Sequence, residues 1–188
     1  DCALAERAAH LEERAGIPPN YSRASFDNFL LPQDNPVAYR GLAGLLLTVR
    51  TFAREFPGTE KPGLLLIGDP GTGKTHLAVA ALRTLLSRGF AGLFYDYQNL
   101  LDRIRAGYDS ASGVSDKEAY RSALDAEILL LDDIGAHRVT DWVEDTITSI
   151  ITSRCNHRRP VIATTNLSDP DAGQNVIERA AGKVEYRL

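Results

Sequence analysis

The stretch GDPGTGKT at positions 68–75 carries glycines, a lysine and a threonine at the spacing G-x-x-x-x-G-K-[ST]. Glycines in a turn between a strand and a helix let successive backbone N–H groups point inward, and the helix N-terminus adds partial positive charge. In such a turn the Lys74 ammonium would reach the β- and γ-phosphates of a nucleoside triphosphate, and the Thr75 hydroxyl would be a ligand of Mg²⁺. A chance glycine turn is the alternative interpretation.

The sequence on both sides of this stretch favours phosphate binding. Residues 63–67 are a short apolar run typical of a buried strand, and residues 75–82 have the composition of a helix. A strand, a glycine-rich turn and a helix are the context that this motif requires. The residues that we predict to contact the nucleotide are Gly68, Asp69, Pro70, Gly71, Thr72, Gly73, Lys74, Thr75 and His76.

Two carboxylates follow a second apolar run. Residues 128–131 are Ile-Leu-Leu-Leu and lead directly into Asp132 and Asp133. Ligands of open α/β sheets sit at the carboxyl ends of the strands, where these side chains would emerge. We predict that Asp132 holds Mg²⁺, directly or through water, and that Asp133 polarises the attacking water. Without the phosphate-binding stretch, an Asp pair after a strand would more often cap a loop.

A third apolar run, residues 161–164, is followed by Thr165 and Asn166. If this strand lies beside the first one, Asn166 comes near the γ-phosphate, where its amide would orient water. Thr-Thr-Asn is a weak signal when it stands alone, and capping of the next turn is the alternative role for Asn166. Its position after the other two elements favours the catalytic interpretation.

Apolar runs alternate with helical patterns along the whole chain. We expect strands at 63–67, 91–95, 127–131, 161–164 and, at an edge, 183–187. Helices are expected at 1–15, 37–56, 75–87, 99–106, 117–124 and 141–156, and a further one after Asp169. This alternation predicts an α/β fold with a largely parallel sheet.

The composition is that of one soluble globular domain: 188 residues, 44% hydrophobic, with a net charge of −4. Contact with nucleic acid would therefore need a local basic patch. No apolar run approaches the roughly 20 residues of a membrane span and no signal peptide is visible, so we expect a cytoplasmic protein without a membrane partner. Cys2 and Cys155 cannot form a disulfide framework or a closed zinc site. The chain starts with Asp and has no Met, as expected of a processed chain or a fragment.

These motifs resemble the Walker A, Walker B and sensor 1 elements of AAA+ ATPases. Within that class, GTGKTHLA at 71–78, LLLDDIG at 129–135 and ATTNLS at 163–168 are similar to bacterial helicase loaders of the DnaC/DnaI type and to IstB-like transposition ATPases. The resemblance implies a P-loop NTPase fold of three αβα layers with a mainly parallel five-stranded sheet. It also implies an N-terminal segment over 1–35 and an AAA+ core over 36–188.

The resemblance further implies the cofactors and partners. It implies ATP or ADP with Mg²⁺, self-assembly through nucleotide interfaces, binding of single-stranded DNA, and placement of a hexameric replicative helicase on that DNA with ATP hydrolysis as the switch. In the family, the segment before the core packs near the adenine, so Ile17, Pro18 and Tyr21 are candidates for that role. Simple packing of the N-terminal segment is the alternative for these three residues.

An arginine from a neighbouring subunit completes the site in AAA+ proteins. Glu178-Arg179 matches the start of the segment that carries it, which makes Arg179 the candidate, with a solvated helix charge as the alternative. The family's segment is longer than the one here, and no sensor 2 arginine is identified. Basic residues also gather at 154–159 and at Arg103 and Arg105, where we expect solvated surface, while an interface role is open for Arg154.

Three other functions compete with a helicase loader. An IstB-like helper ATPase would act on duplex DNA and a transposase. A nucleotide-dependent interaction module would bind without hydrolysis. A small-molecule P-loop kinase is disfavoured by the Asp-Asp and Thr-Thr-Asn elements and by the lack of an arginine-rich lid.

Overall fold

Helices and strands alternate in the computed structural model, which describes residues 2–59, 63–109, 116–135, 140–167 and 184–187. The helices are α1 (Cys2–Arg14), α2 (Pro36–Glu55), α3 (Lys74–Ser87), α4 (Tyr97–Asp109), α5 (Asp116–Asp125) and α6 (Asp141–Asn156), with a 3₁₀ turn at Pro19–Tyr21. The strands are β1 (Leu64–Gly68), β2 (Gly92–Asp96), β3 (Ile128–Ile134), β4 (Val161–Thr165) and β5 (Val184–Arg187). In the described part of the chain, no helix is long and apolar enough to cross a membrane.

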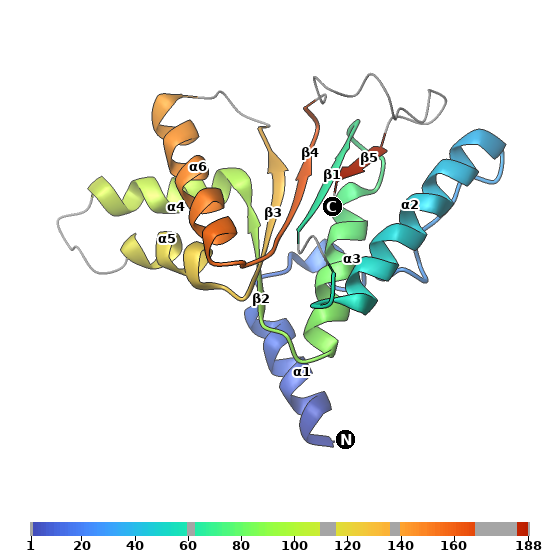
Figure 1. The fold of residues 1–188 in the computed structure, drawn as a ribbon, viewed down its shortest axis with the longest axis horizontal. Coiled ribbons are helices and arrows are strands. Elements are labelled where there is room, and N and C mark those ends of the chain that lie inside the picture. Colours follow the sequence, from blue (N-terminus) through green and yellow to red (C-terminus); the bar gives the residue numbers. More distant parts are fainter. Residues whose placement is uncertain (1, 60–62, 110–115, 136–139, 168–183, 188) are drawn as a thin grey trace.

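One five-stranded sheet has the order β2-β3-β4-β1-β5 (Figure 1). The pairs β2–β3, β3–β4 and β1–β4 are parallel, and β5 runs antiparallel to β1 at the edge. The mainly parallel five-stranded sheet is thus confirmed, with β4 directly beside β1. Because parallel strands end at the same edge of a sheet, the polar residues at the carboxyl ends of β1, β3 and β4 meet there.

Helices cover both faces of the sheet, with α2 and α3 on one side and α4, α5 and α6 on the other (Figure 1). Strand β3 shows the alternation: Ile128 and Leu130 belong to the core cluster with α3, and the next residues, Leu129 and Leu131, belong to the cluster with α4, α5 and α6. Successive side chains of a strand point to opposite faces, so a continuous apolar run fills both interfaces. The three-layer αβα fold is confirmed.

Helix α4 and strand β3 extend beyond their predicted ranges for identifiable reasons. Helix α4 starts at Tyr97, because the Asp96 carboxylate accepts from the Asn99 backbone N–H at 2.8 Å and the Tyr97 side chain is buried. Strand β3 continues through both aspartates to Ile134, which pairs with Thr165 of β4. The aspartates therefore belong to the strand and do not follow it. The helix expected after position 169 lies outside the described residues.

The N-terminal segment packs directly on the sheet and on α3. The Ala15 carbonyl accepts from the Phe94 N–H of the edge strand β2 at 2.6 Å, and Arg83 of α3 donates to the Glu12 carboxylate at 2.6 Å. Ala24 and Phe26 share one hydrophobic core with β1 and α3. The division of the chain into 1–35 and 36–188 stays a prediction about organisation, with helix α2 beginning at position 36.

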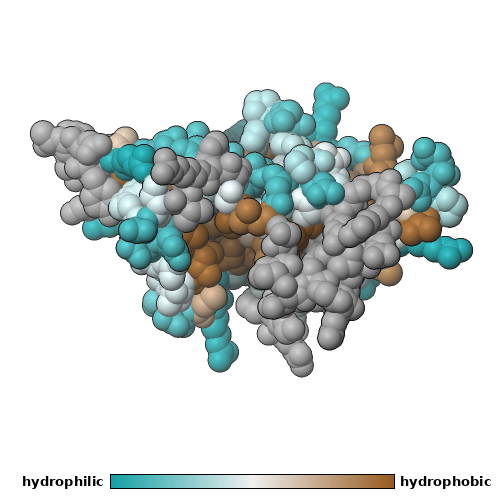
Figure 2. All heavy atoms as spheres, turned by 90° about the horizontal axis from the view of Figure 1, so that it is seen from above, coloured by the Kyte–Doolittle hydropathy of each residue, from teal (hydrophilic) through white to brown (hydrophobic). Residues whose placement is uncertain are grey.

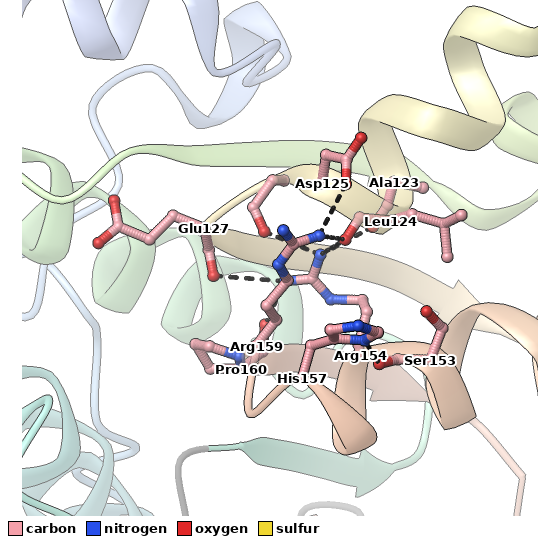
Figure 3. A network of polar contacts seen from close by, with 10 residues as sticks. Ala123, Leu124, Asp125, Glu127, Ser153, Arg154, His157, Arg159 and Pro160 are labelled. Atoms are coloured by element: carbon pink, nitrogen blue, oxygen red, sulfur yellow. Dashed lines mark hydrogen bonds and ion pairs between the residues drawn. The ribbon is translucent and has the colours of Figure 1, made fainter.

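Arg154 corrects the expectation of a solvated basic surface. Its side chain is 0% exposed, and its guanidinium donates to the carbonyls of Ala123, Leu124, Ala126, Glu127 and Pro160 at 2.8–3.4 Å. Burial lowers its pKa to about 10, so it stays charged at neutral pH. Figure 3 shows the guanidinium enclosed by these groups beside Arg159, which donates to Leu124 and Asp125.

Arg154 thus joins the end of α5 to the starts of β3 and β4. These carbonyls lie at the ends of helices and strands, where acceptor capacity is left over, and the rigid guanidinium supplies several donors at once. The Pro160 carbonyl also accepts from the Leu129 N–H at 3.2 Å. The sequence indicated solvated surface because no aromatic stripe accompanies these basic residues; full burial of an arginine is rare. Arg103 and Arg105 are exposed, as expected of solvated surface, and their guanidinium groups lie over the rings of Tyr95 and Trp142.

Arg154→Met is expected to lower the free energy of unfolding by about 3 kcal/mol, because it removes several hydrogen bonds to buried carbonyls. Chemical denaturation followed by circular dichroism measures this. Arg158→Met, at an exposed neighbouring arginine, is the control and should change stability by less than about 0.5 kcal/mol. Equal stability of the two variants would show that Arg154 has no structural role.

Candidate functional site

The phosphate-binding stretch lies between β1 and α3, as the motif requires. Strand β1 ends at Gly68 and α3 begins at Lys74, so the intervening residues form the loop. Gly71 and Gly73 have φ values of 79° and 89°, in the left-handed region that favours glycine. A Cβ atom on Gly73 would also lie 2.5 Å from the Phe29 ring. Both the backbone conformation and this short distance therefore disfavour any side chain at position 73.

Lys74 is buried at the mouth of this loop, with 6% of its side chain exposed. Its ammonium donates to the Asp69 carbonyl at 2.8 Å, and that carbonyl also accepts from the Thr72 hydroxyl at 2.8 Å. Burial lowers the pKa of Lys74, and the nearby carboxylates of Asp133 and Asp132 oppose this shift. A buried cation beside the N-terminus of α3 creates an environment that favours an anion such as a phosphate.

Asp132 and Thr75 lie together at the carboxyl edge of the sheet. The Thr75 hydroxyl lies 2.9 Å and 3.2 Å from the two carboxylate oxygens of Asp132. Burial raises the pKa of Asp132, while hydrogen bonds from Thr164 and Thr75 lower it. Burial makes this carboxylate costly to ionise, and a cation placed beside it would stabilise the ionised form. The hydroxyl and carboxylate oxygens are also the ligand type that Mg²⁺ prefers, so this pair fits a magnesium ion.

Asp133 and Asn166 form the second polar pair of the site. The Asn166 amide donates to the Asp133 carboxylate at 2.7 Å. This contact exists because β4 is the neighbour of both β3 and β1, as the sequence argument about Asn166 required. Lys74, Asp132, Asp133 and Asn166 are therefore brought to one edge of the sheet, next to the phosphate-binding loop. Their roles with nucleotide and metal stay predictions.

The N-terminal segment reaches the loop through residues other than the three that the resemblance suggested. Ile17 and Tyr21 pack, partly buried, against the hydrophobic core, and Pro18 lines a cavity of about 290 Å³ beside β2. Phe29 instead contacts Gly73 and stacks at a tilt on His76, with ring centroids 5.6 Å apart.

His76 also contacts this segment through its Nε2 atom, which lies 2.9 Å from the Ser25 carbonyl. Its contacts with Ser25 and Phe29 fix the imidazole against the N-terminal segment. The only sequence signal for this contact was the pair of aromatics at 26 and 29, which require burial. An adenine-side role for Ile17, Pro18 and Tyr21 stays a prediction.

Figure 2 looks down on the carboxyl ends of the strands and shows mostly hydrophilic side chains with apolar atoms gathered near the middle of the face. Two exposed apolar side chains, Leu30 and Leu167, follow Phe29 and Asn166 directly in the sequence.

Arg179 lies outside the described residues, so its role as the arginine supplied to a neighbour stays a prediction.

The fold and the site define a P-loop nucleotide-binding protein with the AAA+ arrangement of strands. The chain belongs to the family of IstB-like ATP binding proteins, whose model matches residues 53–177. The resemblance to ATPases of the DnaC/DnaI and IstB type is thereby confirmed.

Individual relatives agree with this assignment. The chain is 27% identical over 170 residues to the replicative helicase loader DnaC of Escherichia coli K12, covering 88% of this chain and 66% of the relative. Among solved structures, it matches that of the DnaC helicase loader with a TM-score of 0.67 and 35% identity, over 82% of each chain. The structure of DnaI matches with a TM-score of 0.64 and 27% identity, over 81% of this chain and 77% of that one. The chain spans about two thirds of the length of the curated DnaC relatives that it matches.

Proposed function

We propose that this chain is the ATPase part of a replicative helicase loader. It binds ATP, hydrolyses it with Mg²⁺, and uses the nucleotide state to control its hold on single-stranded DNA and on a hexameric helicase. The observation that carries the proposal is the meeting of Lys74, the Thr75–Asp132 pair and the Asp133–Asn166 pair at one edge of the sheet. The 35% identity to a DnaC helicase loader over 82% of each chain supports the choice of partner.

We assign the residues of the site to phosphate binding, metal binding and activation of water. Lys74 and the backbone N–H groups of the loop bind the phosphates. Thr75 and Asp132 hold Mg²⁺, which neutralises charge on the β- and γ-phosphates. Asp133 polarises the attacking water, and Asn166 keeps that carboxylate oriented and itself faces the γ-phosphate. Ile17, Pro18 and Tyr21 are proposed for the adenine side, and the protein acts in the cytoplasm.

The helicase partner is tested by co-purification. A tagged form of this chain, in its full natural length, is mixed with the replicative helicase of the same organism in the presence of ATP, of ADP or of no nucleotide. Nucleotide-dependent retention of the helicase, together with single-stranded DNA binding, supports the loader. Retention of a transposase and preference for duplex DNA would instead favour the IstB-like helper, which the family match keeps as the alternative.

Self-assembly has its own expected outcome. The described side chains provide a lysine, carboxylates and an amide at the site. We assign to Arg179 of a neighbouring subunit the second cation, which would neutralise charge on the transferred phosphoryl group. ATP turnover per subunit is therefore expected to rise several-fold with protein concentration, and further with single-stranded DNA. Arg179→Ala should reduce the assembled rate at least tenfold without weakening ATP binding. Turnover that is independent of protein concentration and unchanged in Arg179→Ala would contradict completion of the site by Arg179 of a neighbouring subunit.

A further inference from the structure

Strand β3 contains one more residue than β4 at the point where the two carboxylates emerge. Leu131 pairs with Ala163 and Ile134 pairs with Thr165, so Asp132 and Asp133 together stand opposite the single residue Thr164. This is a β-bulge, a feature that re-aims side chains and is frequent beside active sites. It turns consecutive residues, which would otherwise point to opposite faces, toward the same site.

The bulge places Asp133 in an unusual backbone conformation. Its φ is 61°, in the left-handed region that residues other than glycine seldom adopt, although Asp tolerates it better than most. Such a conformation persists only where the surroundings fix it. Here the Asp133 backbone N–H donates to the Thr164 hydroxyl oxygen at 2.8 Å.

The same hydroxyl holds the other carboxylate. Thr164 donates to Asp132 Oδ1 at 2.6 Å, and its side chain is only 1% exposed. Ser and Thr hydroxyls can accept a hydrogen bond and donate one at the same time, which an isosteric valine cannot do. One buried hydroxyl thus joins the backbone of Asp133 to the carboxylate of Asp132.

We propose that Thr164 is a positioning residue for ATP hydrolysis, whose hydroxyl stabilises the bulge and so sets the placement of both carboxylates. Asp132 is then directed toward Thr75, and Asp133 toward Asn166. The inference rests on the proposed ATPase function for its effect on turnover. Nucleotide binding through Lys74 and the loop does not depend on this hydroxyl.

Thr164→Val, which keeps the shape and removes the hydroxyl, tests the proposal. We expect kcat to fall 10- to 100-fold, the range for removing a partner that orients a metal ligand, while the affinity for metal-free ADP changes less than about threefold. Thr164→Ser should restore kcat to within about threefold. The matched control is Thr84→Val on α3, where the hydroxyl donates to the Ala80 carbonyl at 2.8 Å, and its kcat should not change.

A second readout does not require turnover. With ADP present, Mn²⁺ affinity and its electron paramagnetic resonance spectrum report on the Asp132 position. Thr164→Val is expected to bind Mn²⁺ about tenfold more weakly with an altered spectrum, and Thr164→Ser to match the wild type. Where Thr164→Val does not fold, as judged by circular dichroism, Thr164→Ala takes its place in both assays.

The outcomes separate this inference from the proposed function. Wild-type kcat and Mn²⁺ affinity in Thr164→Val, or equal losses in Thr164→Val and Thr164→Ser, overturn the role of Thr164. A wild type that binds ADP and Mn²⁺ but never hydrolyses ATP overturns the proposed ATPase function. In that case the Mn²⁺ comparison alone decides whether Thr164 places the carboxylates.

Discussion

Lys74→Ala is expected to weaken ATP binding by roughly 100-fold or more, which corresponds to at least about 2.7 kcal/mol. The physical reason is that the variant removes a buried cation beside the loop that would bind the phosphates. Hydrogen bonds from a charged donor to a charged acceptor are stronger than neutral ones, and low solvent access at this site increases the difference. Isothermal titration calorimetry with ATP and with ADP measures the loss.

Stability measurements separate this effect from misfolding. Burial lowers the pKa of Lys74, so its charged form is costly in the nucleotide-free protein and the truncated side chain removes that cost. The free energy of unfolding is therefore expected to change by less than about 1 kcal/mol. Arg121→Ala, at an exposed arginine of α5, removes the same charge elsewhere and should bind ATP normally. ATP affinity of Lys74→Ala equal to that of this control would contradict phosphate binding by the loop.

The sequence predicted the fold and the polar groups of the site because their signals are local. A glycine-rich turn between an apolar strand and a helix specifies the loop, and each of the other polar elements directly follows an apolar run. Parallel strands then bring Asp132, Asp133 and Asn166 to one edge, whatever the details of the loops. Prediction succeeded where a few neighbouring residues determine the outcome.

It failed where the determining partner is distant in sequence. Arg154 is buried because carbonyls about 30 residues earlier need donors, and nothing around position 154 indicates this. The bulge at Asp132 and Asp133 depends on Thr164, which lies on a different strand. The contact of Phe29 with Gly73 is equally remote. Each of these contacts is made by tertiary structure, which single-sequence patterns do not encode.

Thr164 also illustrates why a motif can be identified while its mechanism is not. The sequence Thr-Thr-Asn drew attention to its last residue, whose amide was expected to orient water. In the structure the first residue of the three makes the more extensive contacts, to the Asp133 backbone and to the Asp132 carboxylate. A hydroxyl that donates and accepts at once is not distinguishable in sequence from one that only packs.

Asp133→Asn is expected to reduce ATP turnover by about 1,000-fold while nucleotide affinity changes less than about threefold. The Asn166 amide lies 2.7 Å from the Asp133 carboxylate in the wild type. Asn at position 133 keeps the shape and an oxygen that can still accept from this amide. What it loses is the negative charge and basicity that would polarise the attacking water. The effect should therefore appear in kcat and not in KM.

The comparison with Asp132→Asn makes the assignment of the two aspartates testable. Asp132 contacts Thr75, and we assign it to Mg²⁺, so its variant should lose Mg²⁺-dependent affinity for ATP as well as turnover. Metal-free ADP should bind to both variants as it does to the wild type. Loss of Mg²⁺-dependent affinity in Asp133→Asn, combined with stopped hydrolysis and unchanged metal dependence in Asp132→Asn, would mean that the roles of the two aspartates are exchanged.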